Sequence, residues 1–138
     1  MPTNCSEDMR MTTTLPTIGS TTWVVPDGYI PAHSTGPAPE MTSHDSVCIL
    51  NAGASDALVE LYLFFTDRDP LGPYRMHVAA GRAYHQRIND LRDPAVVPVG
   101  VDYSLVLHSD VPIVVQHTRL DSRQAANALM STIAYPAR

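Results

Sequence analysis

One stretch near the C-terminus concentrates side chains that could recognise a ligand or a partner. It covers residues 111–126, begins as a buried strand behind Pro112, and turns polar from Gln116 onward. The polar side chains are Gln116, His117, Thr118, Arg119, Asp121, Ser122 and Arg123. Hydrogen-bonding groups at the end of a rigid strand suit a positioned recognition site. The alternative is that these groups pair with one another and with backbone, as structural ion-pair networks do.

The spacing of the His, Asp and Ser residues gives little support to a catalytic or metal-binding site. Four side chains offer metal-ligating groups, namely His44, Asp45, His117 and Asp121. Structural zinc sites show closely paired Cys or His ligands, which this set lacks, so no metal is predicted. A nucleophilic arrangement of Ser122, His117 and Asp121 lacks the nucleophile elbow that would accompany it. Phosphate-loop and dinucleotide fingerprints are absent too, so the sequence predicts a protein without enzymatic activity or cofactor.

The composition describes a moderately acidic chain of single-domain size. It has 138 residues, and its 14 acidic and 9 basic side chains give a formal net charge of −5. Every basic residue is an arginine. Chains that bind duplexes by neutralising phosphates normally carry a basic run, and none occurs here. Tight non-specific binding of nucleic acid by the monomer is therefore not expected.

Neither a membrane span nor a secretory signal is visible in the sequence. A span needs a continuous apolar run of about 18 residues or more, which is missing. The chain is therefore expected in the cytoplasm, without direct insertion into a membrane. Its two cysteines, Cys5 and Cys48, are too few for a disulfide framework. Cys48 lies in the apolar run 47–50, which predicts a reduced thiol packed in the core.

Apolar alternation divides most of the chain into short strands separated by turn residues. Residues 1–20 lack this periodicity and are predicted to be a flexible lead-in to one domain over residues 21–138. The expected strands cover residues 21–25, 46–51, 57–65, 74–79, 83–89, 102–108 and 111–116. Prolines in residues 29–39 argue against a helix or a central strand and predict a fixed surface loop.

Two features of these strands bear on packing. The strand at 57–65 has apolar side chains on both faces, so its second face is expected to meet a partner surface. The strands at 74–79 and 83–89 are expected to form a hairpin. His77 and His85 would then lie on its exposed rows, where cross-strand pairing or solvation accounts for them.

The pattern as a whole predicts an all-β fold. Pro26–Gly28 and Ser109–Asp110 are expected to be turns, and turn signals recur about every ten residues. Only Ser122–Met130, with its alanines, Leu129 and Met130, favours a helix. We therefore predict an antiparallel β-sandwich of jelly-roll type with a short helical or irregular C-terminal tail.

The polar stretch also carries a resemblance to a known family. Residues 116–125 read Gln-His-Thr-Arg-Leu-Asp-Ser-Arg-Gln-Ala, and residues 131–135 read Ser-Thr-Ile-Ala-Tyr. Further matching segments are 28–31, 43–44, 47–53, 72–75 and 89–91. Together they resemble the sensory rhodopsin transducer family in register over roughly Thr21 to Tyr135. Such extended agreement is far more specific than a single short motif.

The resemblance implies a β-sandwich protein assembled as a homotetramer. It also implies a soluble transducer that docks on the cytoplasmic face of a membrane-embedded sensory rhodopsin and passes on the light signal. An acidic partner suits such a face, because cytoplasmic loops of membrane proteins are rich in Lys and Arg. Candidate interaction residues are Gln116, His117, Arg119, Asp121, Arg123, His44, Tyr29, Tyr74, Arg75 and Asn89.

Two alternatives remain open beside the rhodopsin partner. Family members share the sandwich architecture of carbohydrate-binding domains, so the polar cluster could bind a small polar ligand such as a sugar. Trp23, Tyr29 or Tyr74 could then supply a flat apolar surface for the ligand. DNA binding is a weaker option: it would be salt-sensitive and would use arginines gathered by a tetramer. These arginines are Arg75, Arg82 and Arg87.

Overall fold

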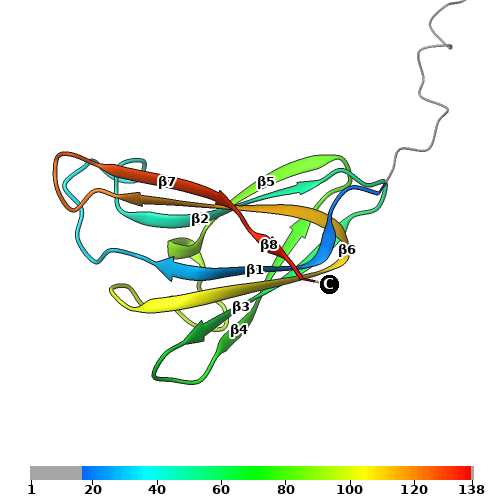
Figure 1. Ribbon diagram of the computed structural model, residues 1–138, viewed down its shortest axis with the longest axis horizontal. Coiled ribbons are helices and arrows are strands. Elements are labelled where there is room, and N and C mark those ends of the chain that lie inside the picture. Colours follow the sequence, from blue (N-terminus) through cyan, green and yellow to red (C-terminus); the bar gives the residue numbers. More distant parts are fainter. Residues whose placement is uncertain (1–16, 138) are drawn as a thin grey trace, which may run out of the picture.

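The computed structural model describes residues 17–137, and they form two antiparallel β-sheets that enclose one apolar core (Figure 1). The first sheet has the strand order β4–β3–β6–β1–β8. Its strands are β1 (Ser20–Tyr29), β3 (Ala57–Phe65), β4 (Leu71–Val78), the first half of β6 (Asp102–Asp121) and β8 (Tyr135–Pro136). The predicted all-β sandwich is therefore confirmed.

The second sheet is built around the other half of β6. Its order is β5–β2–β6–β7, and a short 3-10 helix, η1, follows β5. The elements are β2 (His44–Asn51), β5 (Arg82–Arg87), η1 (Ile88–Asp90) and β7 (Ala128–Ile133). Figure 1 shows β6 curving from one sheet into the other, so this single strand joins the two layers.

Alternating side chains fill the space between the sheets. On β3, Val59, Leu61 and Leu63 point inward and are fully buried, as are Val47 and Ile49 on β2. The strand predicted at 57–65 has these bounds in the structure, because its period-two pattern leaves no other assignment. Its outer face is only partly covered, with Leu58 and Phe64 exposed.

The turn expected at Ser109–Asp110 is wrong, since β6 runs through both residues. Ser109 is buried, and its hydroxyl accepts a hydrogen bond from the N–H of Val111 at 3.3 Å. Oδ1 of Asp110 accepts the N–H of Leu58 at 2.8 Å. Both polar side chains are satisfied inside the sheet, so the strand bends there instead of reversing.

The hairpin expected between residues 74–79 and 83–89 is also wrong. β4 pairs with β3 in the first sheet, whereas β5 pairs with β2 in the second. The connection through Gly81 therefore crosses between layers, although its length is that of a hairpin loop. Consistent with this, His77 contacts Asp56 at 3.0 Å, and His85 lies opposite Cys48 on β2.

The C-terminal segment is extended and not helical. Residues 123–126 form bends, and β7 then pairs with β6 from Asp121↔Ala128 to Gln116↔Ile133. The helix expected at Ser122–Met130 is therefore wrong. Pairing with an open strand outweighs the weak helix preference of alanine, leucine and methionine.

β1 extends further than its apolar run suggested. The strand continues through Pro26 to Tyr29, with a register shift between Val25 and Gly28. The expected turn at 26–28 is thus an irregularity within a strand, a position that tolerates proline. A Cβ atom at Gly28 would overlap the ring of Tyr103, so only glycine fits there.

The loop, the cysteine and the lead-in predicted from the sequence have different outcomes. The loop after β1 is anchored, since the N–H of Thr35 donates to the carbonyl of Ser122 at 2.7 Å. Cys48 is half-buried on the outer face, between inward-pointing Val47 and Ile49, so its predicted core packing is wrong.

The lead-in predicted at 1–20 lies outside the described residues up to residue 16, and β1 begins at Ser20. Within residues 17–137, no helix has the length and apolarity to cross a bilayer.

Candidate functional site

The carboxylate of Asp45 is buried between the two sheets. Asp45 follows the inward alternation of Val47 and Ile49 on β2, and its exposed fraction is 0%. Across the β2–β6 ladder, Asp45 pairs with Arg119 and Val47 pairs with His117. Register therefore places both polar residues of β6 on the inner face next to Asp45.

Three donors converge on the Asp45 carboxylate. Oδ2 accepts the backbone N–H of Tyr29 at 2.9 Å and also the hydroxyl of Tyr103. Oδ1 accepts Nε of Arg119 at 2.9 Å. These donors come from β1 and from both halves of β6, so one carboxylate connects the two sheets.

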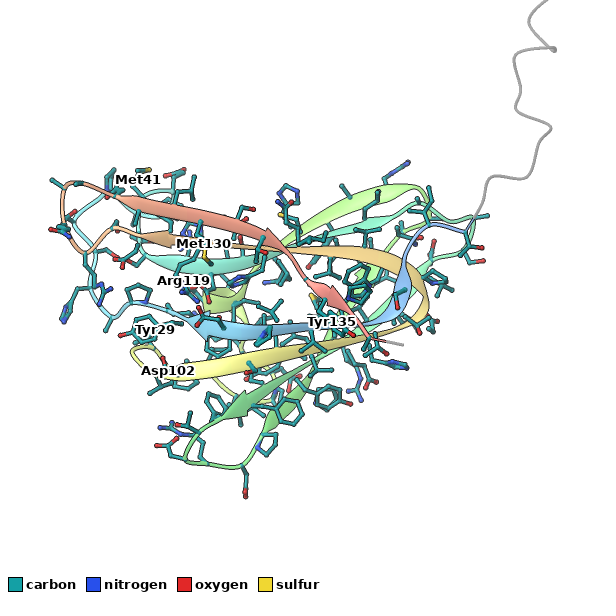
Figure 2. The ribbon with its side chains drawn as sticks, viewed as in Figure 1. Tyr29, Met41, Asp102, Arg119, Met130 and Tyr135 are labelled. Atoms are coloured by element: carbon teal, nitrogen blue, oxygen red, sulfur yellow. The ribbon has the colours of Figure 1, made fainter. Side chains whose placement is uncertain are left out.

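Arg119 extends this connection to the edge of β1. Its Nη2 donates to the carbonyl of Asp27 at 3.0 Å, and its Nη1 lies 3.9 Å from the Asp27 carboxylate. Figure 2 shows Arg119 in the space between Tyr29 on β1 and Met130 on β7, its register partner. The guanidinium thus links β2 of the second sheet to β1 of the first.

Asn89 of η1 completes the network from the other side. Its Oδ1 accepts the N–H of Asp45 at 3.3 Å, and its Nδ2 donates to the carbonyl of Ser43 at 3.1 Å. The amide thereby pairs with the backbone at the start of β2, as a neighbouring strand would.

His117 is the least satisfied member of this group. Its side chain has no exposed surface, and Nε2 lies 3.2 Å from Oδ2 of Asp45. The orientation is poor for a hydrogen bond, and among the described residues neither ring nitrogen has a hydrogen-bond partner. The ring therefore fills the space beside the Asp45 carboxylate without a well-aligned hydrogen bond.

The surroundings shift the pKa values of the two acids. Burial raises the pKa of the Asp45 carboxyl, but contacts with its neighbours outweigh burial and hold the pKa below its usual value. These neighbours are, in order of effect, His117, Arg119 and Tyr103. Burial, together with the Asp45 charge, raises the pKa of Tyr103 far above its usual value. Asp45 is therefore ionised and Tyr103 neutral near neutral pH.

This arrangement suits structural bonding better than catalysis. A carboxylate offers about four acceptor positions, and three donors with a close imidazole surround Asp45. No solvent reaches it. Over the described part of the chain, no group of three or more His, Cys and acidic side chains is placed to hold a metal ion.

Two hollows lie on the surface near this network. The first, with a volume of about 320 Å³, lies where the chain leaves β7 for β8, and we call it the crossing groove. It is lined by Val24, Val25, Pro26, Thr132, Ile133, Ala134, Tyr135 and Pro136. The second, of about 270 Å³, is lined by Asp121, Arg123, Gln124, Ala126 and Ala128.

A family model described as Anabaena sensory rhodopsin transducer matches residues 18–136, which include every strand of the structure described here. The chain belongs to this family. A solved structure of the Anabaena sensory rhodopsin transducer is 51% identical with a TM-score of 0.69, and the match covers 75% of this chain and 100% of that one. The crystal structure of Thermotoga maritima 1070 is 33% identical with a TM-score of 0.73, covering 85% and 94%. No curated protein matches the sequence.

The family resemblance seen in the sequence is thereby confirmed. Four of the interaction residues predicted for this member of the sensory rhodopsin transducer family lie together in the structure. Tyr29, Asn89, His117 and Arg119 all surround Asp45. Of these, Tyr29 contributes its backbone N–H and not its ring.

Gln116 faces away from this network, and the ion pair further along the chain is exposed. Nε2 of Gln116 donates to the hydroxyl of Ser131 at 2.7 Å on the outer face. Asp121 and Arg123 form an exposed pair, with Nη2 of Arg123 at 2.6 Å from Oδ2 of Asp121. Arg123 also lies over the Tyr29 ring, 5.8 Å from its centroid. The polar stretch is therefore divided between two faces of β6 and is not one cluster.

The other predicted residues lie apart. Nδ1 of His44 donates to the carbonyl of Thr42 at 2.7 Å, which fixes the loop before β2. Tyr74 is buried, and its hydroxyl donates to the carbonyl of Ala95 at 2.7 Å, so its ring offers no surface to a ligand. Trp23 is also buried, so its ring offers no surface to a ligand either. Arg75 is exposed beside Glu60 at 3.7 Å.

Sequence reasoning missed the centre of the network. Asp45 appeared only as an unconvincing metal ligand, and neither Tyr103 nor Asp27 was singled out. One signal was available: Asp45 alternates in phase with buried Val47 and Ile49, and a carboxylate at an inward position must have buried partners.

Proposed function

We propose that this protein is a signal transducer that binds the cytoplasmic face of a microbial sensory rhodopsin and relays its light signal. The observation that carries the proposal is the 51% identity, over 75% of this chain, to a protein named for that role. The family match across residues 18–136 supports the same function. The chain would accordingly work in the cytoplasm.

The buried network favours a binding role over an enzymatic one. A catalytic acid or base must reach its substrate within hydrogen-bond distance. Asp45 and His117 have no exposed surface, and the donors around Asp45 come from the protein itself. We therefore assign the network to holding the two sheets together and place the function on the surface.

Charge supports the choice of partner. The net charge is −5, and cytoplasmic segments of membrane proteins carry an excess of Lys and Arg. Opposite charges on two surfaces speed their encounter and orient them. A complex held in this way would weaken as salt is added.

We also propose that the protein forms a homo-oligomer, with a tetramer as the expected state. The outer face of β3 leaves Leu58 60% exposed and Phe64 44% exposed. At the end of the strand, the guanidinium of Arg68 lies over the ring of Phe65, 5.4 Å from its centroid. Apolar side chains gathered on one sheet face are typical of subunit contacts.

Binding to the receptor can be measured directly. Anabaena sensory rhodopsin in lipid nanodiscs would be immobilised, and the full-length protein would be titrated over it in the dark and under illumination. We expect saturable binding with an affinity that depends on light, since a transducer must distinguish two receptor states. Equal binding to empty nanodiscs, or the same affinity in both conditions, would contradict the proposal.

A small polar ligand is the second candidate, and one observation favours it. On the outer face of the second sheet, Gln116, Thr118 and Ser131 form a row of amide and hydroxyl groups suited to other hydroxyls. A ligand at 100 times its dissociation constant would add about 2.7 kcal/mol of stability. A thermal-shift screen of sugars and sugar phosphates, with Gln116→Ala as control, tests this candidate.

DNA binding receives less support within one protomer. Arg75 belongs to β4 of the first sheet, whereas Arg82 and Arg87 belong to β5 of the second. Arg87 also donates to the carbonyl of Pro39 at 2.6 Å and to the hydroxyl of Thr42 at 2.9 Å. Any binding would therefore depend on arginines from different subunits and would be weak and salt-sensitive.

A further inference from the structure

The crossing groove combines apolar walls with apolar side chains left open to solvent. Of its eight lining residues, only Thr132 and Tyr135 carry a side-chain polar group, in each case one hydroxyl. Ile133 is 62% exposed and Tyr135 is 66% exposed. Folding buries such side chains when the protomer itself supplies a cover, so large apolar groups left at a groove mark a place for a partner.

The strand that forms one wall contributes little to the protomer's own core. All six residues of β7 are exposed. Only Ala134, just after the strand, is buried, and its N–H donates to the carbonyl of Val115 at 3.0 Å. Figure 1 shows β7 and β8 passing from the second sheet to the first, where β8 pairs with Trp23 and Val24 of β1. Val25 and Ala134 at the base of the groove belong to the core, whereas the side chains of Ile133 and Tyr135 remain exposed to another molecule.

Charge at the rim narrows the choice of partner. Asp27 directly follows Pro26 of the groove, and its side chain is 81% exposed. Its contact with Arg119 is long, at 3.9 Å. No lining residue is basic. Asp27 makes this edge of the groove acidic and favours a cationic group beside the apolar walls.

We propose that the crossing groove is the receptor-docking site: it takes an apolar side chain from a cytoplasmic segment of the receptor, and Asp27 takes an adjacent Lys or Arg. The inference rests on the proposed function, because that function supplies a partner rich in these residues at the membrane surface. An apolar anchor in a pocket with charges at the rim is the usual division of labour in protein interfaces.

A second copy of this chain fits the groove less well. A closed dimer through this site would be isologous, with the same patch on both subunits. Two acidic rims would then face each other, and like charges across an interface cost binding energy. The outer face of β3 carries one carboxylate, Glu60, and Arg75 lies 3.7 Å from it, so the charge on that face is paired within the protomer.

The test uses matched substitutions on one strand. Ile133→Asp places a carboxylate in the groove, whereas Leu129→Asp makes the same change at a 72% exposed position near the start of β7. Tyr135→Ser removes the second apolar wall without adding charge. Each full-length variant would be titrated over Anabaena sensory rhodopsin in nanodiscs, with melting and light-scattering mass recorded for each.

We expect Ile133→Asp and Tyr135→Ser to weaken receptor binding by about ten-fold or more, as for other central anchors, with Leu129→Asp close to the unaltered protein. Full binding by both groove variants would overturn the docking site and leave the proposed function standing. Equal loss in Leu129→Asp would overturn the groove in favour of the whole strand. A lower mass in the groove variants would identify a second copy as the occupant and also overturn the proposal. Failure of the unaltered protein to bind would overturn the function and the docking site together.

Asp27→Asn tests the charged half of the proposal. The carbonyl that Arg119 binds is retained in this variant, so the network should persist. We expect weaker binding at low salt and a smaller dependence of affinity on salt concentration. An unchanged salt dependence would remove Asp27 from the docking site.

Discussion

Asp45 and Arg119 stand opposite each other on β2 and β6 and together complete the edge of a strand in the other sheet. Asp45 accepts the N–H of Tyr29 at 2.9 Å, and Arg119 donates to the carbonyl of Asp27 at 3.0 Å. A neighbouring strand would normally satisfy these two backbone groups of β1. The Asp45–Arg119 salt bridge therefore replaces the N–H and C=O groups of a neighbouring strand, and it also bonds the two sheets to each other.

Removing Asp45 should cost a large part of the stability. Asp45→Ala leaves Nε of Arg119, the Tyr103 hydroxyl and the Tyr29 N–H without their acceptor. Breaking a buried pair by deleting one partner typically costs about 3–5 kcal/mol. We expect a fall of that order in the free energy of unfolding, measured by urea denaturation.

The matched control is Asp121→Ala on the same network's exposed side. Asp121 binds Arg123 at the surface, and such pairs contribute little because water competes for both charges. We expect near-normal stability for this variant. A loss in Asp121→Ala as large as in Asp45→Ala would mean that the surface pair, and not the buried one, holds the sandwich.

Acid should act through the same carboxylate. The folded-state pKa of Asp45 is lowered, because contacts with His117, Arg119 and Tyr103 outweigh the raising effect of burial. A lowered folded pKa stabilises fully above the unfolded value of about 3.9, and the stabilisation is lost as pH falls through the folded value. The free energy of unfolding should therefore fall with pH below about 4.

Asp45→Asn isolates this contribution to the pH dependence. The variant has no proton to take up at residue 45, so its stability should fall less steeply as pH drops below about 4. Asp121→Asn should keep most of the normal slope, since its pair with Arg123 is exposed. Equal slopes for the unaltered protein and Asp45→Asn would place the acid sensitivity elsewhere.

The fold could be predicted where alternation was regular and failed where polar residues had hidden partners. Residues 57–65 gave the bounds of β3 because apolar side chains recur at every second position. Ser109 and Asp110 look like a turn, yet Asp110 binds the N–H of Leu58 on β3. That partner depends on strand register, which local sequence does not reveal.

The candidate site shows the same limit. His117 and Arg119 were recognised from their residue types, but Asp45 lies 74 positions away from Arg119. Only the pairing of β2 with β6 brings the two together. Side chains alternate along a strand, so neighbouring Gln116 and His117 must point to opposite faces of β6. The prediction of a single polar cluster did not take this alternation into account.

Gly28 offers a test of how closely β1 must approach the network. Gly28→Ala would place a methyl group against the ring of Tyr103, whose hydroxyl binds Asp45. Overpacking of this kind costs about 1–3 kcal/mol, visible as a lower melting temperature. Gly53→Ala is the control, since its nearest contact would be Oδ1 of Asn51 at 3.3 Å. Similar melting of both variants would contradict the close approach.

The outer face of β3 carries the prediction about assembly. Phe64 is 44% exposed and Leu58 is 60% exposed, and we propose that a second subunit covers both. Phe64→Asp should lower the mass measured by light scattering, because it places a charge in an apolar contact. Val96→Asp, at a 64% exposed position in the loop after η1, should keep the mass of the unaltered protein. Oligomers also melt at temperatures that rise with protein concentration, and this dependence should vanish in Phe64→Asp. An unaltered protein that is monomeric, with a melting temperature independent of concentration, would mean that this face serves another partner.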